Sequence, residues 1–174
     1  MDPIRLLTAE HRHMEKLLEE LKKGDAAARA KHFHEMADAL TAHVTVEEKQ
    51  FYPAVRGRRT EDILLESLEE HLSLKRVLAD LLDLDVHEPS WEAKLHVLAE
   101  QVEHHHKEEE SHLFPKVVKM FSHEELDSLG DAMEHELAAL RAQRPAERVL
   151  DETAAAAPLS VPAVQPLAPA SGGR

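Results

Sequence analysis

Residues 43–53, HVTVEEKQFYP, recur later in the chain as residues 105–115, HHKEEESHLFP. Both copies begin with His-x-x-x-Glu and end with an aromatic residue before proline. Each copy is preceded by a Glu-His pair, Glu10-His11 in the first half and Glu70-His71 in the second. The distance from this single histidine to the His-x-x-x-Glu motif is nearly equal in the two halves. The sequence therefore predicts one helical hairpin that is used twice.

Apolar residues spaced three and four apart predict helices around these motifs. Few glycines and an abundance of Leu, Ala, Glu, Lys and Arg agree with an all-α protein. Short connections favour antiparallel neighbours, so we predict an up-down-up-down four-helix bundle followed by a short fifth helix. The expected helices lie at about residues 4–21, 27–52, 61–84, from 89 to a bend or end at Pro115, and 122–142.

Composition excludes several classes of function. The formal net charge of −13 disfavours nucleic acid and an anionic membrane surface as partners. The absence of cysteine excludes disulfides, thiolate metal sites and iron–sulfur clusters. The N-terminus lacks the apolar core of a signal peptide, and no apolar run approaches the roughly 18 residues of a membrane span. We therefore expect a cytoplasmic protein with one domain, residues 1–143.

Residues 144–174 differ in composition from the rest of the chain. Ala, Pro, Val and Ser dominate, and prolines recur between Pro145 and Pro169. This composition predicts a disordered tail. The alternative is a docking peptide that tethers the domain to a protein partner.

The 14 histidines are the compositional anomaly, and some of them lie in phase with the apolar stripes. Residues four apart on a helix differ by about 40° around the axis, so His-x-x-x-Glu directs both side chains to one side. Buried polar groups without partners cost about 1–3 kcal/mol each, and buried carboxylates cost more. Two cations bridged by a carboxylate would remove that cost. The predicted metal ligands are His11, His43, Glu47, His71, His105 and Glu109.

Residues 104–110 allow three His-x-x-x-Glu registers. His105 lies within about 20° of the core direction set by Leu98, whereas His106 lies about 80° away. The repeat independently matches His105 to His43 and Glu109 to Glu47. The flanking histidines and glutamates are therefore expected at the rim or surface. A single such pair would indicate only a surface interaction, and its recurrence in core phase favours metal binding.

The order His, His-x-x-x-Glu, His, His-x-x-x-Glu resembles that of hemerythrin-like proteins with the HHE cation-binding domain. The resemblance covers roughly residues 3–140. It implies a non-haem di-iron centre, with Glu47 and Glu109 as bridges and two histidines for each iron. Oxygen-carrying hemerythrins have five histidines, including His-x-x-x-His on the third helix, where this chain has His71 and Lys75. This departure argues against reversible oxygen carriage.

Imidazole and carboxylate ligands without thiolate suit iron and also tolerate manganese or zinc. We expect two iron ions that bind or react with dioxygen, peroxide or nitric oxide, in sensing or stress defence. The sequence identifies no catalytic residue and no enzyme class. Two alternatives remain, an iron-buffering or regulatory module docked through its tail and a structural bundle without metal.

Overall fold

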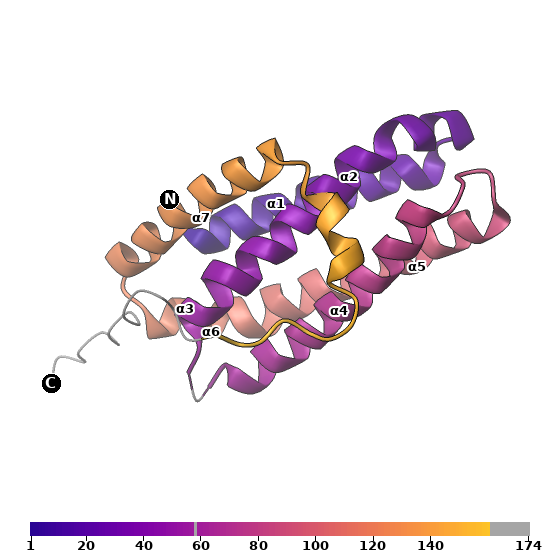
Figure 1. Cartoon of the computed structure of the whole chain (residues 1–174). Coiled ribbons are helices and arrows are strands. Elements are labelled where there is room, and N and C mark those ends of the chain that lie inside the picture. Colours follow the sequence, from indigo (N-terminus) through magenta and orange to yellow (C-terminus); the bar gives the residue numbers. More distant parts are fainter. Residues whose placement is uncertain (58, 161–174) are drawn as a thin grey trace, which may run out of the picture.

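The computed structural model describes residues 1–57 and 59–160, and this part of the chain is helical without any strand. Figure 1 shows the long helices lined up side by side, with neighbours in sequence running in opposite directions. The predicted fold, an up-down-up-down bundle with one further helix, is confirmed. The long helices are α1 (Pro3–Lys23), α2 (Ala26–Val46), α4 (Glu61–Asp83), α5 (Pro89–Glu108) and α7 (His123–Ala142).

The bundle closes as a ring of helix pairs. Helix α1 packs against α2 and α5, and α4 packs against α5 and α2. Helix α7 lies outside this ring against α1 and α2. Side-chain caps define several helix starts: Asp2 accepts from the Ile4 amide at 2.8 Å, and Ser122 forms a capping box with Glu125.

The second helix was expected to end before Pro53, and the fourth to bend or end at Pro115, but both continue past these prolines. Helix α2 continues through a π-helix, η1 (Glu47–Phe51), into α3 (Tyr52–Val55). Helix α5 likewise continues through η2 (Glu109–Leu113) into α6 (Phe114–Met120). Proline lacks the amide that an α-helix would use at that position, and a wider turn just before it accommodates the loss. Both π-helices begin at the glutamate of the repeated motif.

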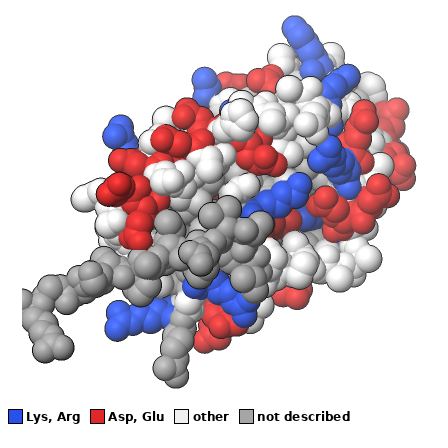
Figure 2. Space-filling model, turned by 60° about the vertical axis from the view of Figure 1, so that its left-hand side comes forward, with Lys and Arg blue, Asp and Glu red and all other residues white. Residues whose placement is uncertain are grey.

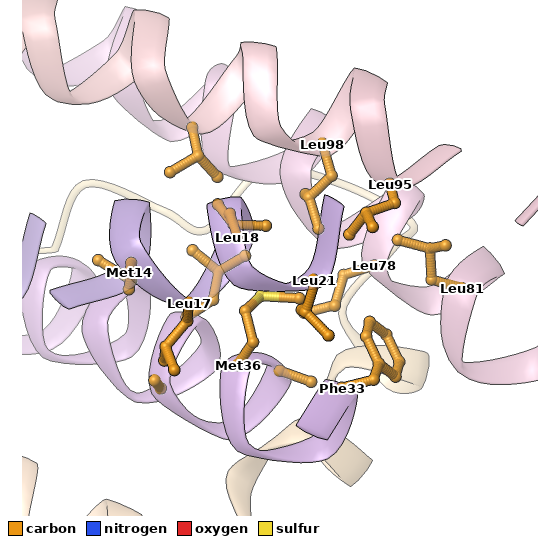
Figure 3. Close-up of a cluster of buried hydrophobic side chains, with 14 of the residues drawn as sticks. Met14, Leu17, Leu18, Leu21, Phe33, Met36, Leu78, Leu81, Leu95 and Leu98 are labelled. Carbon is orange, nitrogen blue, oxygen red and sulfur yellow. The ribbon is translucent and has the colours of Figure 1, made fainter. Parts of the chain in front are cut away.

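Two apolar clusters fill the bundle on either side of a polar layer. One is built around Met14, Met36, Leu78 and Leu98, several of which Figure 3 shows pointing toward one another. The other contains side chains such as Leu7, Val46, Leu68 and Leu113. His11 lies between Leu7 and Met14 along α1, and His71 lies between Leu68 and Leu74 along α4. The histidines therefore stand where the two apolar clusters meet.

The prediction of a disordered tail from residue 144 is wrong for residues 145–151. This segment forms a 3₁₀-helix, η3 (Pro145–Asp151), that packs against α2 and α4. Ala146 and Val149 are buried in the first apolar cluster. The chain then follows α4, where Arg76 donates to the carbonyl of Thr153 at 2.9 Å. The rest of the predicted tail, residues 161–174, lies outside the described residues.

Candidate metal centre

The six predicted ligands converge on one buried site. Four helical segments deliver them, and none of the six side chains is more than 1% exposed. Glu47 and Glu109 are the first residues of the two π-helices. Each follows the histidine of its motif by one helical turn. The ligand atoms fall into two overlapping groups that share Glu47.

The first group lies mainly between α1 and α2. The ligand atoms of His11, His43, Glu47 and Glu109 all lie within 4.8 Å of one another. The Nε2 atom of His43 is 3.2 Å from Oε1 of Glu47, and Nε2 of His11 is 3.3 Å from Oε2 of Glu109. Two imidazoles and two carboxylates thus face a common point.

The second group lies between α4 and α5. Nε2 of His71 is 3.3 Å from Oε2 of Glu47 and 3.0 Å from Nε2 of His105. Nε2 of His105 is 4.0 Å from that same carboxylate oxygen. One oxygen of Glu47 therefore faces His43 and the other faces His71 and His105. A carboxylate in this position can join two ions, which agrees with the bridging role that the resemblance implied for Glu47.

The donor atoms of the cluster fit a cation site. Among the described residues, seven buried side-chain atoms have no hydrogen-bond partner, and they come from only five residues of this cluster: His11, His43, Glu47, His106 and Glu109. Such atoms are costly to bury because they have lost their contacts with water. Imidazole nitrogens and carboxylate oxygens are also the ligand types that iron, manganese and zinc accept.

Carboxylates outside the cluster orient several of the imidazoles. Glu110 lies 2.8 Å from Nδ1 of His11, Glu48 lies 3.1 Å from Nδ1 of His71, and Glu70 lies 2.6 Å from Nδ1 of His105. A hydrogen bond at Nδ1 leaves the lone pair of Nε2 directed inward, the arrangement typical of metal-bound histidine. The sequence left the role of Glu70 open, and the structure places it on His105. Glu10 instead pairs with Arg141.

Burial and opposite charge compete to set the ionisation of these groups. Burial lowers the pKa of the His105 imidazole, but the nearby carboxylates of Glu109, Glu47 and Glu70 outweigh it and raise that pKa to about 10. For Glu47, burial favours the neutral form, and the histidines around it nevertheless hold its pKa well below the usual range. The carboxylate is therefore ionised and available as a ligand.

Two residues of the site were missed by the sequence analysis. His106 was expected at the rim, but it is 1% exposed and its ring stacks on that of His11 with centroids 3.8 Å apart. Tyr52 is fully buried, and its hydroxyl donates to Oε1 of Glu109 at 2.9 Å. Burial and the neighbouring glutamates raise the pKa of Tyr52 well above its usual range, so the hydroxyl keeps its proton. Glu110, also expected at the rim, is only partly exposed and contacts His11.

The remaining histidines lie where the sequence placed them. All of them are exposed and belong to surface positions of the bundle: His13, His32, His34, His87, His96, His104, His112, His123 and His135.

Comparison with known proteins agrees with the fold and the ligand cluster. The family model of the hemerythrin HHE cation-binding domain matches residues 2–117. A hemerythrin HHE cation-binding domain-containing protein from Mycobacterium kansasii has the same fold, with a TM-score of 0.73 and 23% identity over 82% of this chain and 89% of that one. This chain therefore belongs to the hemerythrin HHE cation-binding domain family.

One curated relative is a protein named DNA nickase from Nostoc sp. (strain PCC 7120 / SAG 25.82 / UTEX 2576). It is 29% identical over 127 residues, which make up 72% of this chain. The match spans only 35% of the relative's length. The similarity thus concerns one part of a longer protein.

Proposed function

We propose that this protein holds two iron ions in the buried cluster and that the pair binds or reacts with dioxygen, peroxide or nitric oxide. The observation that carries the proposal is the convergence of unpartnered imidazole nitrogens and carboxylate oxygens around Glu47, whose two oxygens face opposite histidine pairs. His11 and His43 would hold one ion, His71 and His105 the other, and Glu47 both. The ligand set favours iron and tolerates manganese or zinc.

The chain's own residues would position a small ligand and its proton. Two adjacent irons supply two redox equivalents, more than either could provide alone. The Tyr52 hydroxyl lies 3.2 Å from Nε2 of His71 and keeps its proton, which it donates to Oε1 of Glu109 and so fixes the orientation of that carboxylate. Phe114 lies against the ring of His11 with centroids 5.7 Å apart, and it belongs with Phe51 to the second apolar cluster, which limits access of bulk water to the site.

The DNA nickase activity named for the Nostoc relative is not carried over to this chain. Figure 2 shows a face on which acidic and basic side chains are interspersed, and the net charge of the whole chain is −13. Among the described residues, no helix is both long and apolar enough to cross a membrane. We propose a cytoplasmic protein whose partners are small molecules.

Metal analysis of the purified full chain tests the proposal. We expect about two irons per chain, with a near-ultraviolet band that bleaches on reduction and returns with oxygen or peroxide. Iron that binds tightly but reacts with none of the three ligands would instead support the iron-buffering alternative. Protein that binds no metal, with unchanged thermal stability when iron is added, would refute the proposal and favour a structural bundle.

A further inference from the structure

His106 is a buried imidazole that the family motif does not use. Its Nε2 atom has no hydrogen-bond partner. Ligand atoms of His106, His11 and His43 lie within 4.8 Å of one another. Its other nitrogen, Nδ1, lies 3.3 Å from a carboxylate oxygen of Glu15 on α1. His106 thus has the same arrangement as His11, with an outer carboxylate on Nδ1 and an unpartnered Nε2 inside the cluster.

The geometry of α5 explains how adjacent histidines reach opposite sides of the cluster. Successive residues on a helix point about 100° apart. Helix α5 packs against both α1 and α4, so His105 points toward His71 and Glu70 while His106 points toward His11 and Glu15. A residue well off the single core stripe is therefore still inside the bundle.

His106 is a position at which the two repeated hairpins differ in residue type. The corresponding position of the first hairpin is Val44, which is 2% exposed and belongs to an apolar cluster. The first hairpin therefore has an apolar side chain where the second has an imidazole. A histidine in place of a buried valine leaves an unpartnered nitrogen, which needs a ligand to offset its burial.

We infer that His106 is a third imidazole ligand of the ion held by His11 and His43, so that the two metal positions are unequal. This inference rests on the proposed function. The first position then has three imidazoles with carboxylate oxygens from Glu47 and Glu109, whereas the second has His71, His105 and Glu47. Exogenous ligands then bind at the second position, next to the Tyr52 hydroxyl.

Iron binding by the His106→Val variant tests this assignment. The substitution gives the second hairpin the same residue that the first hairpin has at the matching position. The full chain, stripped of metal, is titrated with ferrous iron under anaerobic conditions against a competing chelator. We expect two binding steps in the wild type and a loss of at least about ten-fold in affinity for one of them in the variant. The matched control is His96→Val, which replaces an exposed histidine on the same helix and should bind iron as the wild type does.

The outcomes separate this inference from the proposed function. Wild-type protein without two iron-binding steps would overturn both, whereas wild-type steps that persist unchanged in His106→Val would overturn only the inference. A crystal structure of the iron-loaded wild type provides a test that needs no variant to fold. A bond between Nε2 of His106 and one of the irons supports the assignment, and an imidazole turned away from both irons refutes it.

Discussion

The carboxylate of Glu70 shows how much a single contact outside the ligand cluster contributes to the site. It lies 2.6 Å from Nδ1 of His105, and hydrogen bonding to this imidazole holds the pKa of Glu70 below its usual value despite partial burial. Outer partners of this kind typically change metal affinity by about 10–100-fold. We expect Glu70→Ala to weaken iron binding by about that factor in a chelator competition. Glu69→Ala, which removes an exposed neighbouring carboxylate, should leave the affinity unchanged.

The register of the second His-x-x-x-Glu motif gives a second prediction at the residue scale. Glu109 is fully buried beside His11, whereas Glu108 pairs with His112 on the surface. Glu109→Ala should lose most of the bound iron, and Glu108→Ala should keep it, as measured by metal content after gel filtration. Glu110→Ala should fall between the two because Glu110 only orients His11. Equal loss in all three variants would contradict the register.

The convergence of the six side chains could be predicted from sequence because each one interrupts an apolar stripe. His106 and Tyr52 could not be found in that way. The stripe defines one inward direction for each helix, but α5 has neighbours on two sides, so its buried surface is wider than one stripe. Comparing the hairpins position by position would have shown His106 against the apolar Val44. The repeat marked Tyr52 as the aromatic residue before proline, but the matching residue, Phe114, has no hydroxyl, so the repeat did not indicate a hydrogen bond to Glu109.

At the scale of elements, the packing of η3 against the helix bundle can be tested by substitution. Val149 is fully buried between α2 and α4, whereas the next residue, Leu150, is 54% exposed. We expect Val149→Ala to lower the free energy of unfolding by about 2 kcal/mol, in line with other losses of buried methyl groups. Leu150→Ala should change it by less than about 0.5 kcal/mol, although it removes a larger side chain. Chemical denaturation measures both, and equally small effects would mean that the segment does not pack.

The long helices were predictable because their stripes and caps are local, but the C-terminal segment was not. Its proline-rich composition resembles that of disordered chains, and among its described residues Ala146 and Val149 enter the first apolar cluster. Their burial depends on a groove between α2 and α4 that no local pattern reveals. The segment also reaches the metal centre: Glu152 pairs with Lys75, which pairs with Glu48, the carboxylate on His71. Lys75 occupies the position where oxygen-carrying hemerythrins have a histidine, and here it joins the tail to the site.

For the whole molecule, the layer of ionisable groups between two apolar clusters ties metal binding to stability. The ligand positions come from all four helices of the ring, and the unfolded chain does not hold them together. Each iron ion present at about 1,000 times its dissociation constant would therefore stabilise the native state by about 4 kcal/mol. For a domain of this size, that corresponds to a rise in Tm of roughly 8–16 °C.

Differential scanning calorimetry of the full chain, with bound iron and after chelation, checks this expectation. Glu47→Ala is the informative control because, among the described residues, Glu47 is the carboxylate shared by the two ligand groups. Its Tm should respond little to iron or to chelator. A chelator effect of the same size in Glu47→Ala would place the stabilising metal outside the cluster, since loss of the shared carboxylate weakens both positions together.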